Sequence, residues 1–195
     1  MSRHRRSLGA DYFETMFQGD EDPWNLESSP YEAAKFSRSI QALGGRCYGS
    51  AFEVGCAGGS LTERLAAHTD DLLAVDISET AIDRARRRCA RLPQVRFARM
   101  AFPEDRPQGA GFDLVVLSEV AYYWDEVDLD RASAFLRRGL VSGGDLLLVH
   151  YTGETDYPQS GDDAVASLAG ALADRVDVLR KERHDSYRLD LWRVR

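Results

Sequence analysis

The stretch A-F-E-V-G-C-A-G-G-S, residues 51–60, decides the fold, because it joins a short apolar run to a helical pattern through a glycine-rich turn. Small residues in such a turn let the backbone bend sharply and approach a ligand closely. The next apolar run (LLAVD) ends in Asp76, 21 residues after Gly55. A carboxylate at the end of a second strand can accept hydrogen bonds from both hydroxyls of a ribose. These two features together predict a nucleoside site.

The same alternation of strand and helix continues on the C-terminal side of this loop. Phe112–Ser118 is almost continuously apolar, which is typical of a strand covered on both faces. We expect strands at 51–54, 72–75, 95–100, 112–118 and 145–150, and helices at 60–67, 79–91 and 129–139. This order predicts an α/β fold with a parallel sheet between two layers of helices.

The C-terminal region departs from that alternation. A helix is expected at 162–174, followed by strands at 176–183 and 186–194 that are joined by a short turn at His184–Asp185. A turn of that length joins antiparallel neighbours. The prediction is therefore a mostly parallel, seven-stranded sheet with a C-terminal antiparallel strand.

We expect a single domain over residues 1–195, since the chain has the length of one ordinary domain. Residues 1–45 are rich in aromatic side chains and are predicted to form an N-terminal helical cap, with a helix at 30–43, and residues 46–195 to form the core. The basic run Arg84–Arg91 is interpreted as the solvated face of a helix.

Composition excludes several classes of partner. The formal net charge is −7 and no basic stripe offsets it, so nucleic acid is not an expected partner. No apolar stretch approaches the roughly 20 residues that span a bilayer, and no apolar run follows the basic start Met1–Arg6, so neither a membrane anchor nor a signal peptide is expected. Cys47, Cys56 and Cys89 are odd in number and lack the C-x-x-C spacing, so no disulfide or metal site is expected. The expectation is a cytoplasmic monomer or weak homodimer.

A dinucleotide and S-adenosyl-L-methionine (SAM) are the two ligands that such a layout fits. The dinucleotide motif G-x-G-x-x-G fails here, because Ala57 and Ser60 stand at its second and third glycine positions. Glu53 would repel a pyrophosphate, whereas an acid at that position suits the cationic amino end of SAM, through the loop or a water molecule. A nicotinamide dehydrogenase and a tight turn without any ligand remain the alternatives.

These residues resemble the class I SAM-dependent methyltransferases. The loop is similar to their first motif, with Ala57 in place of its middle glycine, and Asp76 is similar to their ribose acid. The resemblance implies a Rossmann-like three-layer sandwich, SAM as cofactor and S-adenosyl-L-homocysteine as product.

A narrower resemblance is to the nodulation N-methyltransferase family. It is carried by Tyr12, Phe13, Pro23 and Trp24, by Tyr31-Glu32 with Lys35, and by the segments 99–104 (RMAFPE), 117–123 (LSEVAYY) and 150–153 (HYTG). The family methylates the free amine of a deacetylated chitooligosaccharide. The resemblance therefore implies a small polar acceptor, an amino sugar or deacetylated oligosaccharide above all, with a hydroxyl acceptor or a non-catalytic SAM-binding module as alternatives.

The expected cofactor-binding residues lie at the carboxyl ends of the strands and in the cap. Met100 and Phe102 are candidates for the faces of the adenine, with a place in the core as the alternative for Met100. The full set is Trp24, Tyr31, Glu53, Gly55, Cys56, Ala57, Gly59, Asp76, Ile77, Met100, Ala101, Phe102 and Ser118.

Three residues are candidates for catalysis, and all follow the fourth and fifth expected strands. Glu119 can hold an ammonium acceptor or take its proton, although an acid there also stabilises the start of a helix. His150 can act as a base at neutral pH, or it can be structural. Tyr122, with Tyr123 and Trp124, can form an aromatic wall around a sulfonium, although aromatic stripes also build cores.

Overall fold

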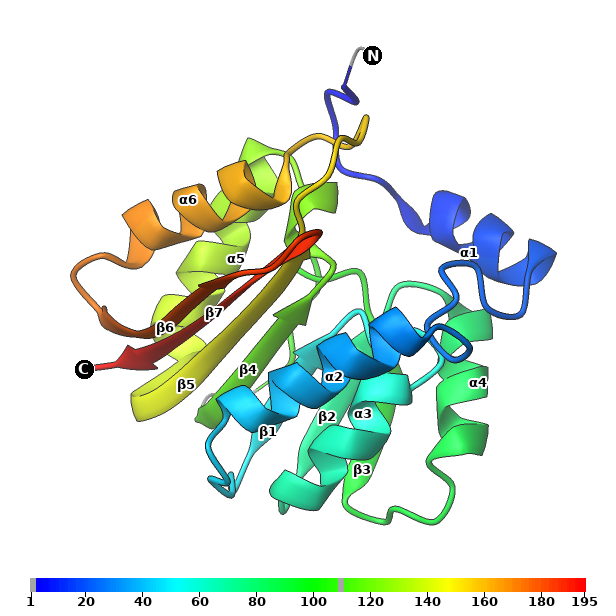
Figure 1. Cartoon of the computed structure of the whole chain (residues 1–195), viewed down its shortest axis with the longest axis horizontal. Coiled ribbons are helices and arrows are strands. Elements are labelled where there is room, and N and C mark those ends of the chain that lie inside the picture. The colour runs from blue at the N-terminus through cyan, green and yellow to red at the C-terminus, as the bar shows by residue number, and fades with distance from the viewer. Residues whose placement is uncertain (1–2, 109–110) are drawn as a thin grey trace. The chain divides into compact units, whose positions relative to one another are not determined.

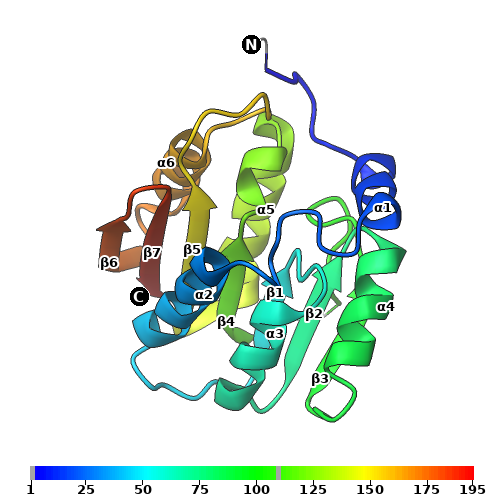
Figure 2. The same cartoon turned by 45° about the vertical axis from the view of Figure 1, so that its right-hand side comes forward.

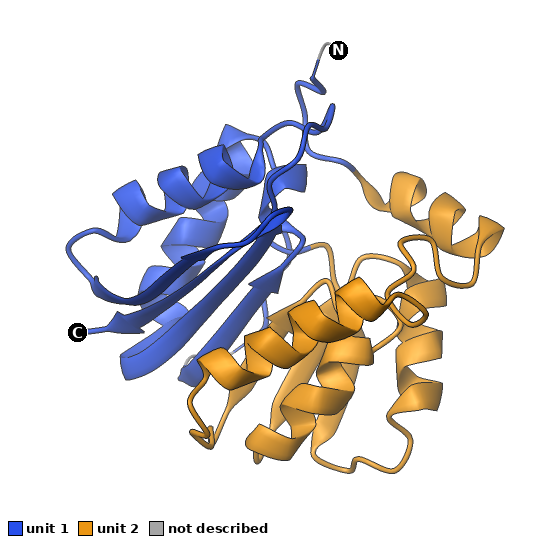
Figure 3. Ribbon diagram, viewed as in Figure 1, with its two compact units in different colours: residues 1–8, 102–195 blue, residues 9–101 orange. Residues whose placement is uncertain are grey.

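The computed structural model describes residues 3–108 and 111–195, so that Met1 and Ser2 of the predicted basic start lie outside the described residues. The chain divides into two compact units (Figure 3). Unit 2 comprises Gly9–Ala101, and unit 1 comprises Phe102–Arg195 together with the residues before Gly9. Each unit is described by itself.

Unit 2 contains three parallel strands and the helices around them. In register, Ala51 pairs with Leu72, and Leu72 pairs with Val95. The strands are β1 (Ala51–Val54), β2 (Leu72–Asp76) and β3 (Val95–Arg99); the helices are α1 (Ala10–Gly19), α2 (Pro30–Ala42), α3 (Ser60–Leu65), the 3-10 turn η1 (Ala66–His68) and α4 (Glu79–Arg88). Figures 1 and 2 show α2 beside α3, where Arg64 donates to Ala33 O and Ser37 Oγ.

Unit 1 contains the four remaining strands. β5 pairs with β4 in parallel, and β7 is antiparallel to both β5 and β6. The strands are β4 (Phe112–Ser118), β5 (Leu140–Tyr151), β6 (Val176–Arg183) and β7 (Tyr187–Val194); the helices are the 3-10 turn η2 (Ala121–Tyr123), α5 (Glu126–Gly139) and α6 (Gly161–Leu172). Fully buried Asp145 in β5 accepts both hydrogen bonds of the Arg193 guanidinium, so a buried charge inside the sheet is paired.

The predicted fold class is confirmed: the strand order is β3-β2-β1-β4-β5-β7-β6, and β7 is the antiparallel strand near the C-terminus. Helix α5 begins three residues earlier than expected because Asp125 caps it, its carboxylate accepting from the Asp128 amide. Helix α1 was not predicted. The single domain and the N-terminal cap stay predictions, and the structure assigns residues 3–8 of that cap to unit 1 and residues 9–45 to unit 2.

Across residues 3–108 and 111–195, no helix combines the length and the apolar character that crossing a membrane would need.

Candidate functional site

The glycine-rich loop of unit 2 follows β1 and is held by its own backbone. The amides of Gly55 and Cys56 both donate to the carbonyl of Val75, at 2.8 and 3.0 Å. Gly59 has φ +85°, and a Cβ there would lie 3.1 Å from Ala85 Cα in α4. Glycine is therefore required at position 59 both by the backbone conformation and by the close approach of the loop to the helix.

Asp76 closes β2 directly beside this loop. Its Oδ2 accepts from the Ala57 amide and its Oδ1 from the Ser78 amide, each at 2.9 Å. Burial raises the pKa of Asp76 to about 6, although these amide hydrogen bonds act in the opposite direction. Each carboxylate oxygen can accept a further hydrogen bond, so the fixed carboxylate suits a pair of ribose hydroxyls.

Glu53 lies in β1, below the loop. It is buried, its Oε2 accepts from Thr62 Oγ1 at 2.6 Å, and burial raises its pKa to about 7. Since Thr62 belongs to α3, the carboxylate joins the strand to the helix that the loop connects. Its predicted interaction with a ligand through the loop stays a prediction.

The end of β3 is tied to the same place. The Met100 amide donates to the Asp76 carbonyl at 2.9 Å, and Arg99 Nε donates to the carbonyl of Ile77. Met100, Ala101 and Ile77 are each partly exposed, so they remain able to contact a ligand beside Asp76. The structure thus brings the unit 2 candidates at the ends of β1, β2 and β3 together.

The predicted cap residues of unit 2, Trp24 and Tyr31, each contact a neighbouring side chain of the cap. Trp24 packs edge-on against buried Phe17, with ring centroids 5.4 Å apart. Tyr31 is exposed, with Lys35 Nζ 5.3 Å from its ring centroid. The roles of Trp24 and Tyr31 at a cofactor stay predictions.

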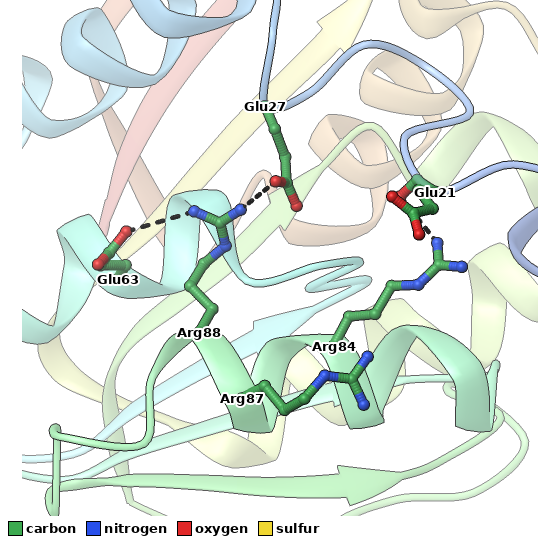
Figure 4. Close-up of a pocket in the computed structure, with 6 residues that line it drawn as sticks. All are labelled: Glu21, Glu27, Glu63, Arg84, Arg87 and Arg88. Carbon is green, nitrogen blue, oxygen red and sulfur yellow. Dashed lines mark hydrogen bonds and ion pairs between the residues drawn. The ribbon is translucent and has the colours of Figure 1, made fainter.

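The basic run Arg84–Arg91 is solvated only in part: Arg86, Arg87 and Arg91 are exposed as expected, whereas Arg84 and Arg88 are partly buried and paired. Arg84 donates to the carbonyls of Phe17, Asp20 and Glu21 at the end of α1. Arg88 Nε donates to Gly58 O, and its guanidinium pairs with Glu27 and Glu63. These side chains surround a pocket of about 510 Å³. Figure 4 shows the six residues that line it: Glu21, Glu27, Glu63, Arg84, Arg87 and Arg88. The number of charges in the sequence does not distinguish this helix from a solvated one, because the arginines pair with backbone carbonyls and with acids that are distant in the sequence.

A second cluster of functional side chains lies in unit 1, where β4 ends. Glu119 has φ +57°, a left-handed conformation that is unfavourable for a side chain of this size. Its Oε2 accepts from Tyr122 Oη at 2.7 Å and from the Tyr151 amide at 2.8 Å. The strained backbone therefore holds a carboxylate between the ends of β4 and β5.

His150 lies beside this carboxylate but is fully buried. Its Nε2 accepts from the Ala121 amide at 3.2 Å, and that bond places the proton of a neutral ring on Nδ1. In this arrangement the imidazole supports the backbone turn that carries Tyr122. Its predicted action as a base stays a prediction.

Three tyrosines pack together next to Glu119. Tyr157, in the loop after β5, stacks on Tyr122 with ring planes 14° apart and meets Tyr123 edge-on at 4.6 Å. Burial and the neighbouring Glu119 raise the pKa of Tyr122 well above its usual range, so its hydroxyl remains a donor. Tyr122 and Tyr123 are buried, whereas Tyr157 is partly exposed, so the ring of Tyr157 is the one of the three that a ligand beside the carboxylate can reach.

Phe102 and Ser118 belong to unit 1. Phe102 is buried and meets the rings of Trp124 and Phe135 at 5.6 and 5.2 Å. Ser118 ends β4 and is partly exposed. Trp124, Tyr122 and Tyr123 are all buried, so the three residues of the predicted aromatic wall pack in the core.

The donor set of unit 2 fits SAM better than a dinucleotide. Two buried acids, Glu53 and Asp76, lie beside the loop, and in their ionised forms they disfavour a pyrophosphate but suit a sulfonium. A Cβ at Gly58 would lie 3.0 Å from Glu27 Oε1, so the loop is also closely covered on that side. Over the described parts of the chain, no group of three or more His, Cys, Asp or Glu side chains is arranged to hold a metal ion.

Comparison with known proteins decides the family. The model of the family described as Nodulation protein S (NodS) matches residues 13–148. The chain belongs to the nodulation protein S family. Nodulation protein S of Rhizobium tropici is 33% identical over 129 residues, which are 65% of this chain and 54% of the relative. Nodulation protein S of Azorhizobium caulinodans is 34% identical over 113 residues, 57% of this chain and 54% of the relative. The chain spans about half the length of these curated relatives.

Solved structures show the same fold for this nodulation protein S family member. The N-methyltransferase NodS from Bradyrhizobium japonicum WM9, in complex with S-adenosyl-L-homocysteine, has a TM-score of 0.76 at 20% identity, covering 96% of this chain and 99% of that one. At that identity the likeness shows the fold. A putative methyltransferase from Pseudomonas syringae is 34% identical with a TM-score of 0.72, covering 84% of this chain and 98% of that one.

Sequence reasoning missed two residues in this nodulation protein S family member. Tyr157 follows β5, and a tyrosine in a loop at the carboxyl end of a parallel strand is a signal that could have identified it. Glu14 in α1 accepts from Ser78 Oγ and Thr80 Oγ1, which lie two and four residues after Asp76. No motif in the sequence pointed to Glu14.

Proposed function

We propose that this protein is a SAM-dependent methyltransferase that methylates a small polar acceptor, an amino sugar or deacetylated oligosaccharide above all, on its amine. The single observation that carries the proposal is Asp76, fixed by the amides of Ala57 and Ser78 at the mouth of a loop that requires glycine at position 59. Membership of the nodulation protein S family supports it.

The residues of unit 2 bind and orient the cofactor in this proposal. Asp76 accepts from the ribose hydroxyls, and the glycine-rich loop admits the amino acid end of the cofactor close to its backbone. Met100 and Ala101 contact the adenine. When bound, SAM supplies an activated methyl group, so that orientation of the reactants, worth roughly 7–11 kcal/mol, dominates the rate enhancement.

The residues of unit 1 bind the acceptor. An amine attacks only in its unprotonated form, and Glu119 is a carboxylate that can take the proton. The Tyr122 hydroxyl and the Tyr151 amide, which both donate to Glu119 Oε2, keep it in place. The partly exposed ring of Tyr157 provides a surface on which a sugar ring can stack, and the buried rings of Tyr122 and Tyr123 behind it exclude water.

The test has two parts. Calorimetric titration with S-adenosyl-L-homocysteine is expected to give saturable binding, and titration with NADH none; the reverse result would establish a dehydrogenase instead. A coupled assay for release of S-adenosyl-L-homocysteine is then run with SAM over amino sugars, deacetylated chitooligosaccharides, small amines and their N-acetylated or hydroxyl counterparts. Turnover confined to free amines supports the proposal. Turnover confined to hydroxyl acceptors overturns the amine assignment, and binding without any product favours a non-catalytic module.

A further inference from the structure

Helix α1 meets the start of α4 through one carboxylate, that of Glu14. Glu14 Oε2 accepts from Ser78 Oγ at 2.6 Å and from the Thr80 amide at 3.3 Å, and Glu14 Oε1 accepts from Thr80 Oγ1 at 2.5 Å. The carboxylate thus receives two hydroxyl donors and one backbone donor at the amino end of α4, where a negative charge is favourable.

The position of α1 is fixed independently at its other end. Arg84 in α4 donates to the carbonyl of Phe17 in the last turn of α1 and to those of Asp20 and Glu21 directly after the helix. Phe17 itself is buried. Each helix therefore caps an end of the other, and Glu14 is held against Ser78 and Thr80 by the packing of the whole helix.

Ser78 connects this contact to the carboxylate of Asp76. Its amide donates to Asp76 Oδ1 at 2.9 Å, and its hydroxyl accepts from the Ala81 amide at 3.1 Å while donating to Glu14. A change in the Ser78 backbone therefore moves one of the amides that orient Asp76, beside those of Ala57 and Ile77. The chain of contacts runs from Glu14 through Ser78 to Asp76.

We propose that Glu14 is a positioning residue of the cofactor site, which orients Asp76 toward the ribose by fixing Ser78. This inference rests on the proposed binding of SAM. It assigns to α1 a part in the affinity for the cofactor, although α1 was not expected from the sequence. The described hydrogen bonds of Asp76 do not include Glu14, whose negative charge nevertheless acts on Asp76 directly and, in addition to burial, raises the pKa of that carboxyl.

The experiment measures the dissociation constant of S-adenosyl-L-homocysteine by calorimetry for the full chain and for Glu14→Gln, Asp76→Ala and the double variant. Glu14→Gln replaces one acceptor oxygen by a donor and is expected to weaken binding about tenfold, the equivalent of one lost charge-assisted hydrogen bond. In the Asp76→Ala background the same substitution is expected to change affinity less than twofold, since Glu14 acts through Asp76. Asp11→Asn makes the same charge change on an exposed position of α1 and is the control.

Thermal unfolding without ligand separates positioning from folding. If Glu14 merely stabilised the packing of α1 on α4, affinity losses would add in the double variant, and that result overturns the inference. Thr80→Val removes the Thr80 Oγ1 donor and leaves Ser78 in place, so it is expected to lower the unfolding temperature but to weaken binding less than Glu14→Gln does. A larger loss of affinity in Thr80→Val than in Glu14→Gln also counts against the route through Ser78.

If the unchanged protein does not bind S-adenosyl-L-homocysteine, the proposed function itself fails. If binding occurs and depends on Asp76 but not on Glu14, this inference alone fails.

Discussion

Each unit has a strand end at which a residue other than glycine adopts a left-handed backbone conformation, and the two residues differ in kind. In unit 2 it is Ala57, with φ +47°, which offers its backbone amide to Asp76. In unit 1 it is Glu119, with φ +57°, which offers its side chain to Tyr122 and Tyr151. The strain at Ala57 can be relieved by glycine without loss of a functional group, whereas the strain at Glu119 is inseparable from its carboxylate.

The largest effect on activity is expected from a substitution of Glu119 in unit 1. Glu119→Gln keeps the size of the side chain but removes the proton acceptor, so kcat/KM for an amine is expected to fall by about 10²–10⁴-fold. The affinity for S-adenosyl-L-homocysteine is expected to stay within twofold, because the proposed cofactor residues around Asp76 are unchanged. Glu154→Gln, at an exposed position of the same unit, is the control. Equal activity of the two variants would remove Glu119 from the mechanism.

Asp76→Ala tests the unit 2 side of the comparison. Two charge-assisted hydrogen bonds to ribose are lost, so the dissociation constant of S-adenosyl-L-homocysteine is expected to rise about 100-fold. Asp70→Ala, just before β2, has a similar change of charge and serves as the control. Unchanged calorimetric titrations for Asp76→Ala would contradict the assignment of the whole cofactor site.

The same contrast explains what the sequence could predict. The unit 2 loop was predictable because its geometry depends on glycine and on a carboxylate at a fixed spacing, and both can be read directly from the amino-acid sequence. β4 and its end at Ser118 were predictable from a continuous apolar run. The contact of Glu14 with Ser78 and the stacking of Tyr157 on Tyr122 depend on side chains that packing brings together from distant segments, and no local pattern records them. The pairing of Arg84 with the end of α1 was missed for the same reason, so this arginine was wrongly interpreted as solvated.

The buried acids of unit 2, Glu53 and Asp76, are expected to make the stability of the fold depend on pH. Burial raises the pKa of Glu53 to about 7 and that of Asp76 to about 6, both above the values of the unfolded chain. The folded state therefore binds more protons than the unfolded state between about pH 4 and pH 7, so these groups stabilise the fold at low pH and that contribution is lost as the pH rises through 6 and 7. Glu14, whose pKa is lowered to about 2, acts in the opposite sense below pH 4.5 and does not affect this window.

The unfolding temperature without ligand is accordingly expected to fall by a few degrees between pH 5 and pH 8, while the affinity for S-adenosyl-L-homocysteine rises as Asp76 ionises. Glu53→Gln is expected to flatten the stability profile, since an amide does not titrate, and to leave the rise in affinity in place. A stability profile with the same slope in Glu53→Gln would show that this carboxylate is not responsible.

The smallest effect is expected from Ala57→Gly, which concerns the strain alone. An alanine in the left-handed region is disfavoured by about 1 kcal/mol, and glycine adopts this conformation without steric strain but loses more entropy on folding. The net result expected is an increase of about 0.5 kcal/mol in the free energy of unfolding, with affinity for S-adenosyl-L-homocysteine unchanged because the amide that donates to Asp76 is retained. Ala34→Gly, at an exposed position inside α2, is the matched control and is expected to lower stability by about 0.5–1 kcal/mol. Denaturant unfolding of the two variants should therefore give shifts of opposite sign. A loss of stability in both would mean that Ala57 is not strained, and the difference between the two strand ends would then rest on the side chain of Glu119 alone.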